Sequence, residues 1–287
     1  MPLIKSKSYV LAQKNNKGFT LLEMILVIII LGIMGAGISG FITLSTQTYL
    51  NATNRDELVG NARFVIERLN RELRNALPNS IRIKDYNGGQ SQCLQFTPIA
   101  ASTVYSDIPV APEVASETLT VIPFNNAIGN SYQCDDNDSD SENHCDGLVT
   151  VYPLTNDDIY QGHNDITGKT FLFEKVAATD ITLENAVHFN EDSPTQRLYL
   201  INNQVSYCAT SGFIYRYEEP ITIGDQVTPP ASNNAMVKMA GYLNNNLPFN
   251  YQPATLKRNA VVQIHLAFAK NDESYVFNHE IHINNVP

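Results

Sequence analysis

The sequence lacks the residue patterns that mark most enzymes. It has no tryptophan, no G-x-S-x-G nucleophile elbow, no P-loop and no H-E-x-x-H metalloprotease motif. The segment His279-Glu280-Ile281-His282 has the wrong spacing for that motif and falls in a predicted strand. The glycine run Gly35-Ala36-Gly37 lies inside a long uncharged segment, where it cannot cradle a phosphate. We therefore expect a protein that is not an enzyme.

Basic residues are scarce over most of the chain. There are 19 lysines and arginines against 29 acidic residues, which gives a formal net charge of −10. Residues 1–18 reverse this balance, because they contain lysines and no acidic residue. An acidic body repels nucleic-acid phosphates, so we expect no nucleic-acid partner.

The four cysteines form no C-x-x-C pair, which argues against zinc or thioredoxin-like chemistry. An even number of cysteines beyond a membrane favours disulfides, although reduced thiols remain the alternative. Four cysteines allow three connectivities. We favour Cys134–Cys145, which closes a short polar loop, and by elimination Cys93–Cys208.

Residues 24–44 contain no charged side chain and are long enough to cross a bilayer as a helix. Lysines precede this segment and acidic residues dominate after it. The positive-inside rule then places the N-terminus in the cytoplasm and the body on the outer side of the inner membrane. Glu23 lies just inside the apolar segment. A carboxylate in that position is costly and usually has a partner and a role.

The segment Gly18-Phe19-Thr20-Leu21-Leu22-Glu23 resembles the class III signal of type IV prepilins and pseudopilins. The resemblance implies that a prepilin peptidase/methyltransferase cuts between Gly18 and Phe19 and then methylates the amino group of Phe19. Glu23 would be the family's assembly acid, paired with the cationic N-terminus of a neighbouring subunit. An uncleaved signal anchor with a stray glutamate is the alternative.

Two features predict one long helix after the cleavage point. Gly32, Ala36 and Gly40 recur every four residues, a small-residue ridge that allows close helix packing or simply softens the helix. Further along, apolar residues follow the helical period and predict a stripe that packs on a core. These residues are Leu58, Ala62, Val65, Leu69, Leu73 and Ala76. Pro78 is expected to end the helix after Leu77.

The predicted domains are a removed leader at 1–18, a transmembrane and filament-core helix at 19–44, its amphipathic continuation at 45–77 and a β-rich head at 78–287. Residues 62–76 are similar to PilW-type minor pilins, J-type pseudopilins of type II secretion and MshO-type proteins of MSHA pili. The resemblance implies a type IV pilin fold, α+β, with the long helix packed on an antiparallel β-sheet.

The head reads as short strands separated by turn residues. Its clearest hairpin joins Ala260–Ala269 to Ser274–Ile283, and His265 could face His279 across it. Asn202-Asn203 could form a tight turn between two strands. The stretch from Pro220 to Pro253 is predicted to be a loop, with a possible short helix around Ala235–Leu243. The other expected strands are Cys93–Thr97, Thr118–Pro123, Gly147–Leu154, Thr170–Val176, Arg197–Asn202, Gln204–Cys208 and Phe213–Tyr217.

An acidic loop between Cys134 and Cys145 is a candidate calcium site. Its alternating oxygen ligands are like the start of a calcium-binding loop, but the usual glycine and final glutamate are missing. A solvated acidic loop is the alternative, and no other cofactor is expected. The candidate ligands are Asp136, Asp138, Asp140 and Glu142.

Together these patterns predict a minor pilin in the priming or tip complex of a type IV pilus, most like the MSHA type. The expected partners are the prepilin peptidase, other major and minor pilins, and the inner membrane. The chain would start as a single-pass inner-membrane protein with a periplasmic head and then enter the pilus at the cell surface. The alternatives are a J-type pseudopilin, or a tip adhesin whose head binds a ligand.

Overall fold

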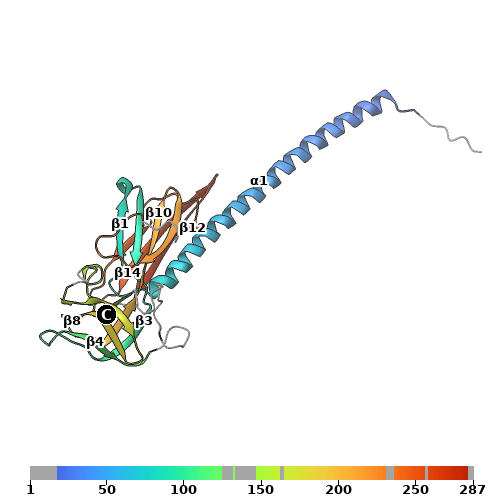
Figure 1. Ribbon diagram of the computed structural model, residues 1–287. Coiled ribbons are helices and arrows are strands. Elements are labelled where there is room, and N and C mark those ends of the chain that lie inside the picture. Colours follow the sequence, from blue (N-terminus) through green and yellow to red (C-terminus); the bar gives the residue numbers. More distant parts are fainter. Residues whose placement is uncertain are drawn as a thin grey trace, which may run out of the picture. The chain divides into compact units, whose positions relative to one another are not determined.

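The computed structural model describes residues 18–124, 132, 147–161, 165–230, 236–255 and 258–283. The chain divides into two units, Met1–Thr53 and Asn54–Pro287. The helix α1 (Leu21–Arg74) provides most of the first unit and the beginning of the second. It is long and apolar enough to cross a membrane, and its most apolar stretch is not buried within the protein (Figure 1).

The helix ends three residues before the position predicted from Pro78. The amide of Leu77 donates to Thr97 O (2.8 Å), and the side chain of Asn75 donates to Ile99 O (3.0 Å). These bonds draw the chain out of the helical path, so α1 ends at Arg74. Tertiary contacts, rather than proline alone, set this boundary.

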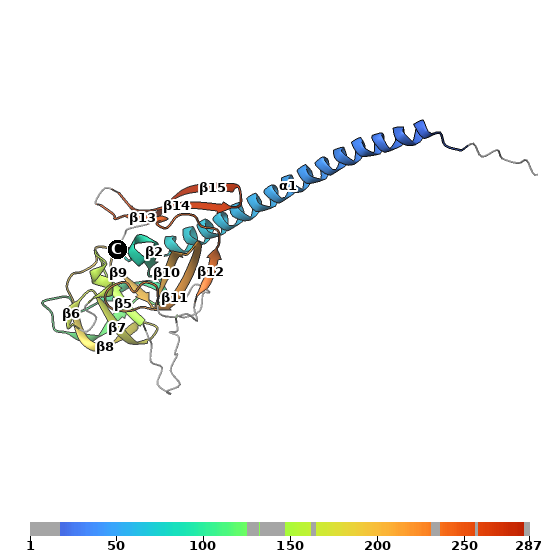
Figure 2. The same ribbon diagram turned by 90° about the horizontal axis from the view of Figure 1, so that it is seen from above.

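The predicted apolar stripe is confirmed, because Leu58, Ala62, Val65, Leu69 and Leu73 are fully buried and Ala76 is almost so. They pack into one core with two antiparallel sheets, which lie on opposite sides of this part of the helix (Figure 2). The five-stranded sheet has the order β1 (Arg82–Tyr86), β2 (Ser91–Phe96), β10 (Asn203–Thr210), β11 (Phe213–Pro220) and β12 (Val237–Ala240). The three-stranded sheet has the order β13 (Phe249–Gln252), β14 (Ala260–Lys270) and β15 (Glu273–Ile283).

The described strands between Ala101 and Ile201 form a separate closed barrel, which the sequence did not predict. Its sheet runs in the order β4, β3, β9, β5, β7, β8, and β4 pairs with β8 to close the ring. A two-residue strand, β6, pairs in parallel with β8. The barrel has its own apolar core. Its strands are β3 (Ala101–Asp107), β4 (Ser116–Val121), β5 (Gly147–Val151), β6 (Thr167–Gly168), β7 (Thr170–Val176), β8 (Asp180–Phe189) and β9 (Arg197–Ile201).

The barrel is inserted between two neighbouring strands of the five-stranded sheet. The chain leaves that sheet at the end of β2 and returns to it at the start of β10, and these strands pair directly. Cys93 and Cys208 lie opposite each other in this pair and are joined by a disulfide, the pairing favoured from the sequence. The bond therefore fastens the two strands close to the point where the insertion begins.

The short helix α2 (Asp157–Tyr160) attaches the barrel to the segment that follows α1. Tyr160 is fully buried, and its hydroxyl donates to Ser80 O (2.9 Å) and shares a hydrogen bond with Thr97 Oγ1 (2.9 Å). The guanidinium of Arg82 stacks on the Tyr160 ring at 3.6 Å from its centroid. Burial raises the pKa of Tyr160 to about 12 and lowers the pKa of Arg82.

Four sequence predictions about the head are wrong. The head is two sheets and a barrel rather than one sheet. Asn202 does not turn between strands of one sheet, because β9 lies in the barrel and β10 in the five-stranded sheet. The stretch from Pro220 to Pro253 is not simply loop with a short helix, because it contains β13 and, in the described part of Ala235–Leu243, strand β12, which pairs with β11. His265 lies opposite Asn278, not His279, because the hairpin turn places Lys270 opposite Glu273.

Candidate functional site: the N-terminal segment

The predicted cleavage point lies immediately before α1. Gly18, Phe19 and Thr20 are exposed and non-helical, and 77% of the Phe19 surface is accessible. A peptide bond in a helix is held by hydrogen bonds to its neighbours, whereas an extended one is open to an enzyme. The local structure thus leaves the Gly18–Phe19 bond accessible.

Thr20 caps the N-terminus of the helix. Its side-chain oxygen accepts a hydrogen bond from the Glu23 amide (3.2 Å), and its carbonyl accepts one from the Met24 amide (3.2 Å). The spacing Thr20-x-x-Glu23 is that of a capping box, which fixes where a helix begins. The sequence itself contains this signal, in the spacing of Thr20 and Glu23. The cap keeps Phe19 outside the helix and places Glu23 in its first turn.

Glu23 is exposed in the first turn of α1. A carboxylate there is stabilised by the partial positive charge of the helix N-terminus. Among residues 18–124 and the other described parts of the head, Glu23 forms no ion pair. Its side chain is therefore available to a cation from outside the described chain.

The small-residue ridge of Gly32, Ala36 and Gly40 lies on the exposed part of α1. A Cβ atom added at Gly32 or Gly40 would meet no heavy atom within 4 Å. Packing within this chain therefore does not require glycine at either position. Glycine in a helix interior costs about 1 kcal/mol relative to alanine. An intermolecular helix contact would offset that cost, since small residues let helix backbones approach closely.

Threonine hydroxyls in the next part of the helix are bonded to its own backbone. Thr43, Thr46, Thr48 and Thr53 each donate to the carbonyl four residues earlier, at 2.8–3.0 Å. Each hydroxyl is satisfied without water, which reduces the cost of placing it in apolar surroundings. These four hydroxyls therefore oppose burial of the helix in a membrane or filament less than unbonded hydroxyls would.

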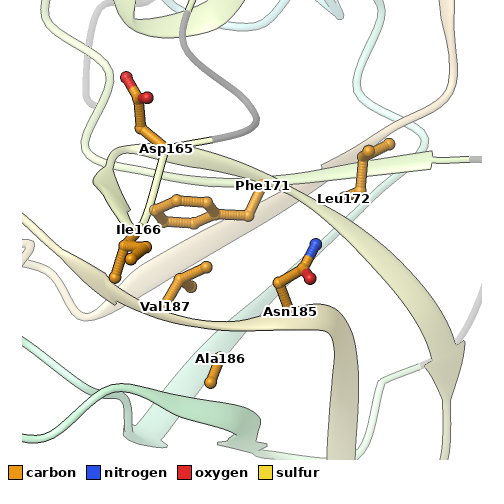
Figure 3. A pocket seen from close by; sticks show the side chains of 7 residues that line it. All are labelled: Asp165, Ile166, Phe171, Leu172, Asn185, Ala186 and Val187. Atoms are coloured by element: carbon orange, nitrogen blue, oxygen red, sulfur yellow. The ribbon is translucent and has the colours of Figure 1, made fainter.

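The head contains a surface cavity of about 320 Å³ on the barrel (Figure 3). Its side chains come from the approach to β6 and from β7 and β8. They offer one carboxylate, Asp165, and one amide, Asn185, which is not a nucleophile–base pair. Within the described residues, no group of three or more histidine, cysteine, aspartate or glutamate side chains is placed to hold a metal.

Several predicted site residues lie outside the described residues. They are residues 1–17 of the leader, the cysteines Cys134 and Cys145, and the candidate calcium ligands Asp136, Asp138, Asp140 and Glu142. The second disulfide and the calcium site therefore stay predictions.

Comparison with known proteins agrees with this geometry. Residues 13–39 match the family model described as the prokaryotic N-terminal methylation motif. Searches of curated proteins and of solved structures returned no match. The matched segment contains Gly18, Phe19 and Glu23, together with Gly32 and Ala36 of the small-residue ridge. It implies processing by a prepilin peptidase and association with pilins, and with the apolar helix it suggests membrane anchoring. The motif therefore indicates a type IV pilin-like or pseudopilin-like chain.

Proposed function

We propose that this chain is a non-catalytic minor pilin that takes part in assembly of a type IV pilus, within the priming or tip complex and of the MSHA type. The observation that carries the proposal is the exposed Gly18–Phe19 junction, directly followed by a capped helix with Glu23 in its first turn. The J-type pseudopilin of a type II secretion system is the alternative within the same class.

Assembly would follow from cleavage. Removal of residues 1–18 by a prepilin peptidase leaves Phe19 as a cationic, N-methylated terminus. That terminus pairs with Glu23 of a neighbouring subunit in the membrane. In a medium of low dielectric constant, leaving either charge unpaired is strongly unfavourable, so the pair selects one register between subunits. The small-residue ridge then packs against neighbouring helices.

A tip adhesin is a second candidate function, and the inserted barrel favours it. The barrel has its own core and a surface cavity, and the sheets that pack on α1 are complete without it. A module added in this way is suited to carry a separate binding activity. Binding of a surface ligand by the full chain, lost on substitution of Asp165 or Asn185, would support this role.

The first experiment is to express the chain with and without its prepilin peptidase. Intact mass and N-terminal sequencing then report the processed end. We expect a peptidase-dependent start at methylated Phe19. A chain that retains residues 1–18, or is cut elsewhere, would contradict the proposal.

Assembly is tested separately with matched variants. Glu23→Gln should be processed normally but incorporated poorly into pili, whereas Glu67→Gln, an exposed change on the same helix, should assemble normally. Gly32→Leu alters the ridge and should reduce incorporation more than Gly35→Leu. Neither glycine has a heavy atom within 4 Å of an added Cβ, so both chains should fold alike. Equal incorporation of all four variants would exclude the proposed contacts.

A further inference from the structure

The strand β15 forms a long, uninterrupted edge of the head. It pairs with β14 from Lys270↔Glu273 to Ala260↔Ile283 without a register shift, and its other side has no partner strand among the described residues. The edge strands β1, β12 and β13 have only five, four and four residues. Natural proteins protect such edges with lysine, proline, bulges or short strands. β15 is long and has no lysine, proline or bulge, and its acidic residues, Glu273 and Glu280, leave residues 274–279 uncharged by acid or lysine, so this middle part of the edge is suited to pairing.

Hydrogen bonds of β14 show which main-chain groups face that edge. In β14, the amides of His265 and Ala269 donate to Pro248 O and Tyr242 O (2.8 and 2.9 Å), away from β15. In an antiparallel pair, residues opposite such outward-facing groups also direct their amides and carbonyls outward. The residue opposite His265 is Asn278, and the alternation continues in steps of two. The outward set on β15 is therefore Ser274, Val276, Asn278, Glu280 and His282.

The side chains of this set are all exposed, and they include Val276, which is 58% exposed. An exposed β-branched residue in the middle of an open strand offers apolar contact to an added strand. Main-chain groups and side chains therefore both favour pairing with another extended segment.

A cavity of about 310 Å³ lies where β15 meets the end of α1. It is lined by Asn70 and Arg74 of the helix and by residues 279–282 of the strand. Arg74 Nε donates to Asn70 Oδ1 (3.1 Å), which holds the guanidinium beside the cavity. Arg63 and Arg71 are exposed on the same part of the helix. These three arginines outnumber the two exposed carboxylates nearby, Glu67 and Glu280, and the resulting positive charge suits a carboxylate on the incoming segment.

We propose that the β15 edge binds an extended, acidic segment of another pilin-type subunit by β-strand addition. The added strand pairs with the outward main-chain groups of β15, and its carboxylate binds at Arg74. Strand addition gives affinity through main-chain hydrogen bonds, while neighbouring side chains give specificity. The inference depends on the proposed function in one respect, because the proposed function is what makes the partner a pilin-type subunit.

Hydrogen exchange of the full-length chain tests the proposal. Amides of Ser274, Val276, Asn278 and Glu280 should exchange rapidly in the subunit alone in detergent. In the purified complex with its co-assembled pilin subunits, we expect exchange to slow at least tenfold. Unchanged exchange in an intact complex would overturn the proposal. Slow exchange that depends on the concentration of the isolated chain would identify a second copy as the occupant and overturn the choice of partner.

Matched variants distinguish an effect at the β15 edge from a general loss of folding. Asn278→Pro removes one outward amide without breaking a β14 bond, and it should abolish protection in the complex, whereas Asn278→Ser should retain it.

Arg74→Glu should weaken the complex, whereas Arg63→Glu should have a smaller effect. A photo-crosslinker at Val276 should react with an acidic segment of a pilin subunit, whereas one at Glu117 in the barrel should not. N-terminal processing should stay normal throughout, so failure here is distinguishable from failure of the pilin proposal.

Discussion

The hydroxyl of Tyr207 on β10 donates a hydrogen bond of 2.9 Å to the carboxylate of Glu72 on α1. The same carboxylate accepts bonds from Arg216 on β11 and from Arg68 one helical turn away. Glu72 and Arg216 are largely buried, and burial together with Glu72 raises the pKa of Tyr207. This polar cluster fixes the position of the five-stranded sheet against the helix.

Loss of Glu72 should therefore destabilise the head. Glu72→Ala leaves Arg216 without its partner on the helix, and we expect the free energy of unfolding to fall by about 3 kcal/mol. Tyr207→Phe removes only a neutral donor and should cost about 1 kcal/mol. Chemical denaturation monitored by circular dichroism measures both, with Glu67→Gln as an exposed control. A loss no larger than that of the control would show that the cluster does not stabilise the fold.

Alkaline pH should weaken the attachment of the barrel through Tyr160. Its pKa is raised in the folded state to about 12, from an ordinary value of 10, mainly by burial. The neutral form is thus favoured by folding, so this contribution is complete below pH 10 and is lost as pH rises through about 12.

Denaturation at a series of pH values checks this. Tyr160→Phe should lower stability at neutral pH, because the bonds to Ser80 and Thr97 are lost, and should reduce the decline in stability above pH 10. Tyr49→Phe, at a tyrosine that is 71% exposed, should leave the profile unchanged. An unaltered alkaline slope in Tyr160→Phe would contradict the assignment.

The Cys93–Cys208 disulfide should contribute strongly to stability. It joins residues 115 positions apart, and long closed loops lose most entropy in the unfolded chain. The double variant Cys93→Ala/Cys208→Ala should lose about 2–4 kcal/mol, measured without reductant. The predicted Cys134–Cys145 disulfide would close a much shorter loop, so Cys134→Ala/Cys145→Ala should lose less. The opposite order would indicate that the loop-entropy explanation is wrong.

Gly147 should tolerate no side chain. It begins β5, and an added Cβ would lie 2.5 Å from the ring of Phe173 in the barrel core. Gly147→Ala must displace that ring, and we expect a loss of about 1–3 kcal/mol. Gly60→Ala in α1 meets no heavy atom within 4 Å and should be neutral or slightly stabilising. Thermal unfolding of the two variants in parallel distinguishes them, and equal melting temperatures would refute the packing explanation.

Local patterns in the sequence predicted the features that depend on neighbouring residues. The stripe from Leu58 to Ala76 follows the helical period because one face of a helix packs on the core. The β14–β15 hairpin was predicted because alternation and a short turn are also local signals. The processing motif Gly18-Phe19 and the acid Glu23 were likewise read directly from adjacent residues.

Only the tertiary structure decided how distant strands combine. Nothing near Phe96 or Asn202 shows that the chain leaves one sheet, closes a barrel and returns, because strand pairing depends on partners far apart in sequence. The cluster around Glu72 is hidden in the same way, since its partners Tyr207 and Arg216 lie more than 130 residues away. The sequence by itself determined the helix and its processing signal. Long-range packing determined the architecture of the head. Contacts between distant segments are favourable only once the whole core assembles, so no local segment specifies them.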